Sequence, residues 1–125
     1  MTILDLSFSN AKPCTSSTAV ILNHLSPRQG ANLEGADLEE AILKNANLQK
    51  ANLVKANLEQ ANLNQANLSG ANLSRAELEQ ASMDSANLNR ANLNEADLEQ
   101  ANVSAAKLQG VSLKGATMPD GTTHD

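Results

Sequence analysis

The chain has 125 residues, a net charge of −5 and one aromatic residue, Phe8. This length suits a single domain with a buried core, whereas the acidity and the scarcity of aromatic rings argue against direct binding of nucleic acid. The single cysteine, Cys14, has no second cysteine to pair with and no Cys or His at metal-ligand spacing. It indicates an unpaired thiol in a reducing compartment.

Residues 1–30 are expected to form an N-terminal cap. Leu4, Leu6 and Phe8 alternate with polar residues and favour a short strand, and residues 16–25 carry apolar side chains at helical spacing before Pro27. This predicts a short strand and a short amphipathic α-helix that pack on the first repeat. The segment has no basic region followed by a long apolar run, so we expect a soluble, cytoplasmic protein with no membrane contact.

Residues 31–118 contain the central residues of eighteen consecutive five-residue repeats, without an insertion. We call the central residue of each repeat position i; position i−2 is almost always Ala, position i−1 is mostly Asn or Asp, and positions i+1 and i+2 are mostly polar. Leucine at position i is the predicted structural core, and these leucines are Leu33, Leu38, Leu43, Leu48, Leu53, Leu58, Leu63, Leu68, Leu73, Leu78, Leu88, Leu93, Leu98, Leu108 and Leu113. Met83, Val103 and Met118 complete the series.

A period of five fits neither a helix nor a flat strand. In a helix each repeat advances the leucine by roughly 140°, so the leucines would spread over every side. In a strand the leucine would change face at every repeat. A chain that turns a corner once per repeat avoids both problems, because i−2 and i then point inward together. The pattern therefore predicts an all-β solenoid.

The variable positions indicate four repeats in each coil. Glutamate recurs every twenty residues at position i+1, in Glu39, Glu59, Glu79 and Glu99. Gly35, Gly70, Gly110 and Gly115 all fall at position i+2, where a corner can require unusual backbone angles. The array then spans about four and a half coils, or roughly 22 Å at the spacing of β-strands.

Residues 119–125 are predicted to form a C-terminal tail. Pro119, Asp120 and Gly121 favour a turn that ends the array. Because a stack of coils has open ends, we expect a tail this short to cover the last coil only in part. The chain is then a monomer or a weak homodimer formed through this end, near Met118.

The repeated Ala-(Asn/Asp)-Leu-x-x unit resembles the signature of pentapeptide-repeat proteins, and the resemblance covers residues 31–118. It implies a right-handed quadrilateral parallel β-helix with Leu at i and Ala at i−2 in the core. Some members of that family resemble DNA in shape and charge and bind DNA gyrase, conferring quinolone resistance. This role is the alternative function, although the net charge is small, no Phe occupies position i and no loop projects from the array.

No catalytic set is apparent in the sequence. The two histidines, His24 and His124, have no accompanying carboxylate pair, nucleophile or phosphate loop. A filled solenoid is expected to offer no cleft for a small molecule. We therefore expect no enzyme activity, no cofactor and no metal, and the primary hypothesis is a structural or protein-interaction module whose protein partner is unknown.

One predicted side of the solenoid is acidic. It carries Glu40 and the candidate interaction residues Asp37, Glu39, Glu59, Glu77, Glu79, Asp97 and Glu99, without Lys or Arg among them. The sequence places Lys50, Lys55, Arg75, Arg90, Lys107 and Lys114 on the neighbouring sides. Such a side either only solubilises the protein or forms a docking surface for a basic partner or a weak cation site.

Overall fold

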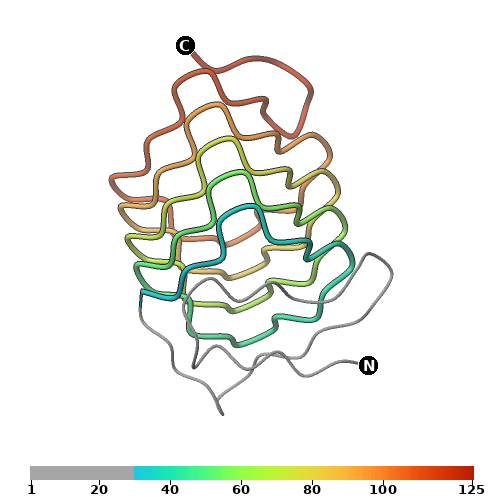
Figure 1. The fold of residues 1–125 in the computed structure, drawn as a ribbon. Helices are drawn as coiled ribbons and strands as arrows, with labels where there is room; N and C mark the ends of the chain where they lie inside the picture. The colour runs from blue at the N-terminus through green and yellow to red at the C-terminus, as the bar shows by residue number, and fades with distance from the viewer. Residues whose placement is uncertain (1–29) are drawn as a thin grey trace.

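The computed structural model describes residues 30–125, which wind into a stack of four-sided coils (Figure 1). Parallel bridges join residues twenty apart, as between Asn32 and Asn52 and between Asn52 and Asn72, so one coil holds four repeats. Residues 30–125 contain no helix and no extended strand, because each repeat contributes a single bridged residue. None of these residues forms a helix that could cross a membrane. The predicted N-terminal strand and helix lie outside the described residues.

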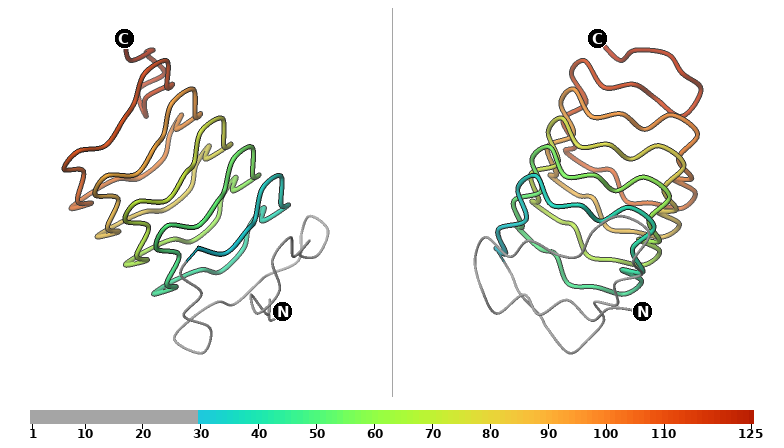
Figure 2. Two further views of the ribbon diagram at one scale, coloured as in Figure 1. Left: turned by 60° about the vertical axis from the view of Figure 1, so that its left-hand side comes forward. Right: turned by 45° about the vertical axis from the view of Figure 1, so that its right-hand side comes forward.

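We number the four sides in chain order. Side 1 contains the repeats centred on Leu33, Leu53, Leu73, Leu93 and Leu113, and side 2 contains those centred on Leu38, Leu58, Leu78, Leu98 and Met118. Side 3 contains the repeats centred on Leu43, Leu63, Met83 and Val103, and side 4 contains those centred on Leu48, Leu68, Leu88 and Leu108. The views in Figure 2 show the successive coils stacked in register. Side 4 therefore lies across the core from side 2.

The repeat 56–60 shows how all five backbone N–H groups are satisfied. Asn57 donates its N–H to the preceding coil, at Ala36 O (2.9 Å), whereas Leu58 and Gln60 donate theirs to the following coil, at Glu77 O (2.7 Å) and Glu79 O (2.9 Å). Ala56 closes the corner by donating to Leu53 O at 3.0 Å. The fifth N–H, that of Glu59, donates to Asn57 Oδ1 at 3.0 Å. Position i−1 thus favours Asn or Asp because its side chain supplies the acceptor that the backbone lacks.

Each corner is a β-turn whose third residue has a positive φ angle. In the turn that Ala56 closes, Lys55 has a φ of 59°, which identifies a type II turn. Glycine fits this conformation best, yet most corners here carry Gln, Lys, Arg, Glu, Asn, Ser or Ala. The stacked hydrogen bonds therefore hold ordinary residues in the left-handed region.

The core consists of the i and i−2 side chains. Every Leu at position i from Leu33 to Leu98 is at most 3% exposed, and no polar side chain is buried within residues 30–125. The core prediction is wrong for Leu108, which is 44% exposed, and only partly right for Leu113, which is half-buried. Both lie in the last coil, and no other coil of residues 30–125 covers them.

The C-terminal tail turns back onto part of the last coil. Thr117 and Thr123 form an antiparallel bridge, and the N–H groups of Gly115 and Met118 donate to His124 O and Thr122 O, each at 2.7 Å. The same edge continues around sides 3, 4 and 1, where the N–H groups of Val103, Leu108 and Leu113 have no acceptor within residues 30–125. The last coil is therefore capped on one part of its edge and open on the rest.

Candidate interaction surfaces

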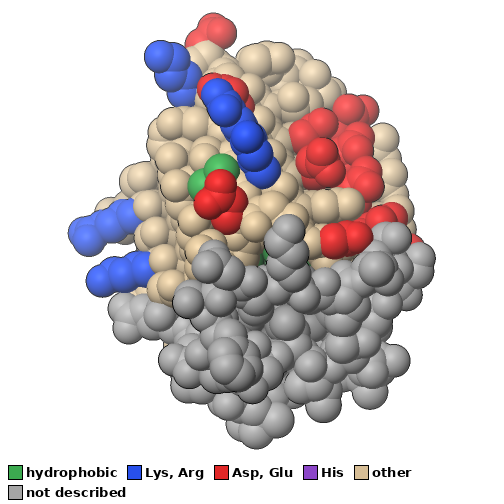
Figure 3. Space-filling view, viewed as in Figure 1, with side chains coloured by type: hydrophobic (Ala, Val, Ile, Leu, Met, Phe, Trp, Pro, Cys, Tyr) green, Lys and Arg blue, Asp and Glu red, His purple; other side chains and the backbone are tan. Residues whose placement is uncertain are grey.

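The register gathers the seven predicted acidic residues on side 2. Asp37, Glu77 and Asp97 occupy position i−1 of successive side 2 repeats, and Glu39, Glu59, Glu79 and Glu99 occupy position i+1. Figure 3 shows Asp and Glu side chains clustered at the right of the view, while Lys and Arg side chains project at the left. Side 2 thus presents carboxylates in columns that follow the stack.

The two columns of carboxylates have different roles in the fold. The side chains of Asp37 and Asp97 accept the N–H groups of Glu39 at 3.3 Å and Glu99 at 3.0 Å, so these aspartates are parts of turns. The glutamate side chains of the i+1 column make no such bond to the backbone. They are the groups that a partner can contact without disturbing the corners.

The carboxylates of side 2 are close enough to perturb one another. The pKa of Glu79 is raised, first because its side chain shares a hydrogen bond with Glu59, then because of the negative charge of Asp97. Carboxylate oxygens of Glu79, Asp97 and Glu99 lie within 4.8 Å of one another. Three such oxygens are the kind of ligand that a hard divalent cation prefers, although exposed acidic groups commonly occur without one.

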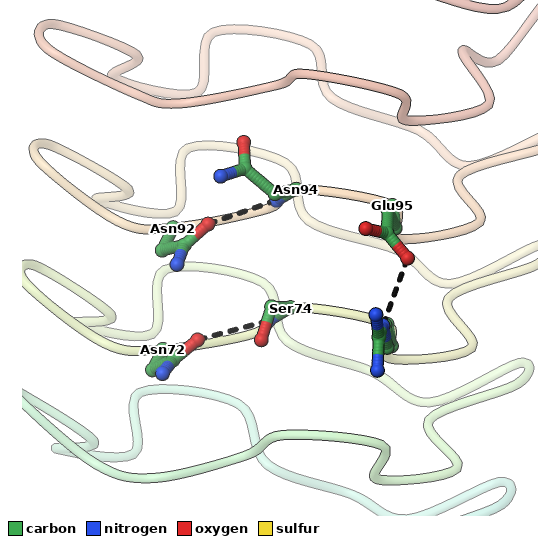
Figure 4. A network of polar contacts seen from close by, with 6 residues as sticks. Asn72, Ser74, Asn92, Asn94 and Glu95 are labelled. Carbon is green, nitrogen blue, oxygen red and sulfur yellow. Dashed lines mark hydrogen bonds and ion pairs between the residues drawn. The ribbon is translucent and has the colours of Figure 1, made fainter.

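The corner between sides 1 and 2 carries an ion pair. Arg75 Nε donates to Glu95 Oε2 at 2.8 Å, from one coil to the next (Figure 4). The hydrogen bond and the opposite charge raise the pKa of Arg75 and lower the pKa of Glu95. Both side chains are 58% exposed, so the pair contributes little to stability.

The prediction for the basic residues requires a correction. Lys55, Arg75 and Lys114 do belong to side 1, next to the acidic side. Lys50, Arg90 and Lys107 instead belong to side 4, opposite the acidic side, because these repeats are two corners away from side 2. The described molecule therefore has an acidic side and a basic side across one core.

The expectation of no cleft is also wrong. Side 4 has an open hollow of about 300 Å³ between neighbouring coils, and the residues that line it are Gln49, Lys50, Ser69, Gly70, Asn87, Asn89, Arg90 and Gln109. The core is filled as expected, and the hollow lies outside it, where glycine alternates with long side chains. That alternation is present in the sequence but becomes visible only when residues are aligned every twenty positions.

Three asparagines at position i+1 have structural roles that the sequence analysis missed. Asn64 Oδ1 accepts the N–H of Asp84 (2.9 Å) and the hydroxyl of Ser82 (2.6 Å), one coil later. Asn94 does the same for Lys114 and Ser112, and Asn89 accepts the N–H of Gln109. In each case the later repeat lacks Asn or Asp at i−1, so an amide from the coil before supplies the acceptor.

Comparison with known proteins identifies relatives of the same architecture. A family model described as pentapeptide repeats matches residues 29–60, 51–90 and 61–100. Among curated proteins, none matches the chain.

Three solved structures show the likeness in detail. A pentapeptide repeat protein from the thylakoid lumen of Arabidopsis thaliana is 33% identical, with a TM-score of 0.55, and the match covers 78% of this chain and 64% of that protein. Rfr23 from the cyanobacterium Cyanothece 51142 is 35% identical, with a TM-score of 0.51, and the match covers 92% of this chain and 67% of Rfr23. A third pentapeptide repeat protein, from Nostoc PCC 7120, is 36% identical, with a TM-score of 0.51, and the match covers 64% of this chain and 62% of that protein.

This chain therefore spans about two thirds of the length of these relatives. Pentapeptide-repeat proteins form right-handed quadrilateral β-helices, and the four-sided coils described above have the same architecture. The chain belongs to the pentapeptide-repeat family.

Proposed function

We propose that this protein is a non-enzymatic interaction module that binds a basic protein partner through side 2. The observation that supports the proposal is the column of glutamates Glu39, Glu59, Glu79 and Glu99, which the twenty-residue register places above one another with no Lys or Arg between them on that side. A row of like charges held on a rigid surface attracts a partner whose cations have a matching spacing.

The raised pKa of Glu79 supports the same interpretation. When neighbouring carboxylates raise the pKa of a carboxyl group, an approaching cation stabilises its charged form, because the cation relieves the repulsion between the carboxylates. The attraction acts between exposed groups, so added salt is expected to weaken it. A docking surface of this kind is expected to give fast, salt-sensitive association.

A matched pair of charge reversals tests the proposal. We expect the double variant Glu59→Lys/Glu99→Lys to lose binding of a lysine-rich peptide, measured by NMR titration at low ionic strength. The control double variant Glu34→Lys/Asp84→Lys changes the net charge equally but alters sides 1 and 3. Loss of binding in both variants to the same extent would show attraction by net charge alone and would contradict a site on side 2.

The alternative function, a DNA mimic that binds DNA gyrase, has less support from the charge distribution. Duplex DNA presents phosphates around its whole circumference, with a charge every ~1.7 Å of its axis. Side 4 carries Lys50, Arg90 and Lys107 and no Asp or Glu. Inhibition of gyrase in a supercoiling assay by the purified protein would nevertheless favour this alternative over the proposed module.

We further propose that two copies associate weakly through their C-terminal ends. The support is the open edge of the last coil, where the N–H groups of Val103, Leu108 and Leu113 lack acceptors among the described residues. Beside this edge, Leu108 is 44% exposed, and Val103, Leu113 and Met118 are half-buried around a small apolar hollow. Unpaired backbone donors next to apolar side chains favour addition of another chain at a sheet edge.

A further inference from the structure

The hollow on side 4 owes its shape to a regular alternation at one corner. Position i+2 of successive side 4 repeats is Lys50, Gly70, Arg90 and Gly110, and Gly30 stands one coil before them. Because successive coils are about 4.8 Å apart, Lys50 and Arg90 arise about 10 Å from each other. The coil between them has no side chain at that corner, which leaves a gap bordered by two cations.

The two cationic side chains run along the stack. A Cβ atom on Gly70 would lie 3.4 Å from Lys50 Cγ, and a Cβ atom on Gly110 would lie 3.3 Å from Arg90 Cγ. Each cation therefore packs its aliphatic part over the glycine of the following coil. This contact places the aliphatic part of Lys50 in the gap, directed toward the coil of Arg90, and it directs the Arg90 side chain over Gly110, away from the gap. Both cations line the hollow.

The neutral groups of the hollow add hydrogen-bond donors. Asn87 Oδ1 accepts the N–H of Asn89 at 3.1 Å, and Asn89 Oδ1 accepts the N–H of Gln109 at 2.9 Å. With both oxygens engaged by the backbone, each amide retains its NH₂ group as a donor. Ser69 adds a hydroxyl, and no Asp or Glu lines the hollow.

The charges of the hollow are not neutralised by the rest of the described chain. Within residues 30–125 the ion pair is that of Arg75 with Glu95, on another corner. Lys50 and Arg90 form no ion pair with a carboxylate in this part of the chain, although the net charge of the protein is −5. A concave surface with two cations, several donors and no carboxylate is suited to an anion.

We propose that the hollow on side 4 binds a small oxyanion with at least two negative charges, of the class of diphosphate or triphosphate chains. A single phosphate can contact Lys50 or Arg90, whereas a chain of phosphates can contact both cations across the gap. Arg90 can hold one end through a bidentate contact, and Lys50 supplies a compact charge for the other. None of the residues that line the hollow is aromatic, so a nucleoside attached to the phosphates finds no ring to stack on.

Calorimetric titration of the full chain with inorganic tripolyphosphate at low ionic strength tests the proposal. Lys50→Gln and Arg90→Gln are each expected to weaken binding about tenfold, since each removes one charged hydrogen bond. Orthophosphate is expected to bind about tenfold more weakly than tripolyphosphate for the same reason. ATP without magnesium is expected to bind as tripolyphosphate does, whereas a clear preference for ATP would contradict a site that recognises phosphates alone.

Filling the gap provides a test that leaves the charge unchanged. Gln60 and Gln80 occupy position i+2 with φ angles of 57° and 58°, so Gly70→Gln is compatible with the corner. We expect this variant to keep its fold, checked by circular dichroism, and to bind tripolyphosphate at least about tenfold more weakly, because the new side chain competes with that of Lys50 for the gap and displaces the cation.

Two control variants keep the proposal falsifiable. Lys55→Gln removes one positive charge from side 1, and Gly35→Gln adds a side chain at a corner where a Cβ atom meets no atom within 4 Å. Both are expected to bind tripolyphosphate as the unaltered protein does. Equal weakening by Lys55→Gln and Lys50→Gln, or no binding by the unaltered protein, would overturn the proposal.

Discussion

At the scale of the residue, position i−1 decides how the N–H of position i+1 is satisfied. Most repeats use their own Asn or Asp, as when Asn72 accepts the N–H of Ser74 at 3.1 Å (Figure 4). Where Ser82 stands at i−1 instead, Asn64 of the coil before supplies the acceptor. Thr117 needs no substitute, because the i+1 residue of its repeat is Pro119, which has no N–H.

This exchange of acceptors predicts an unusual cost for substitution of one half-buried asparagine, Asn64. Asn64→Ala removes the acceptor for both Asp84 N–H and Ser82 Oγ, which are half-buried, so we expect it to destabilise the protein by about 1–3 kcal/mol. Asn64→Asp keeps an acceptor oxygen and is expected to cost less. Urea denaturation measures the free energy of unfolding of each variant. The control Ser74→Ala, at the equivalent position of side 1, should leave it nearly unchanged. If Asn64→Ala lowers it no more than Ser74→Ala does, Asn64 does not have this role.

At the scale of the repeat, the period of five predicts the architecture because only a corner in every repeat keeps all leucines on one side of the backbone. Glycine at i+2 points to the positive φ angle, but the sequence gives no sign that Gln, Lys or Ala adopt it, because the cause is the stacking of hydrogen bonds between coils. The acidic side can be predicted, since Glu39, Glu59, Glu79 and Glu99 share one register. The hollow with Lys50 and Arg90 cannot be predicted from a single repeat, because its shape depends on residues in four coils.

The strain at the corners predicts a stabilising substitution. Ala105 has a φ of 55° and a side chain that cannot hydrogen-bond to offset the strain. Ala105→Gly removes a left-handed penalty of about 1–2 kcal/mol and adds the entropy cost of glycine, so we expect a net gain of up to about 1 kcal/mol. Thermal unfolding measures the difference. The control Ser104→Gly, one residue earlier and at a position without a positive φ angle, should lower the stability. Equal losses of stability in Ala105→Gly and Ser104→Gly would contradict the expectation.

At the scale of the whole molecule, the solenoid separates three kinds of surface. Side 2 presents carboxylates, side 4 presents cations, and the C-terminal edge presents backbone donors beside apolar side chains. This separation follows from the four-repeat register, because a residue type that recurs every twenty positions stays on one side along the entire stack. Each surface can therefore be altered by substitutions that leave the shared core unchanged.

Association through the C-terminal edge is expected to depend on Leu108. Its side chain is 44% exposed on the last coil, so a charge there need not disturb the coils beneath it. We expect Leu108→Glu to abolish the concentration-dependent increase in mass that sedimentation equilibrium should show for the unaltered protein, because a second copy would have to bury that charge. Ile42→Glu changes the other large exposed apolar residue among those described, which is 37% exposed on side 3, and should leave association intact. A constant monomer mass for the unaltered protein, or equal loss of association in both variants, would show that the open edge does not bind a second copy.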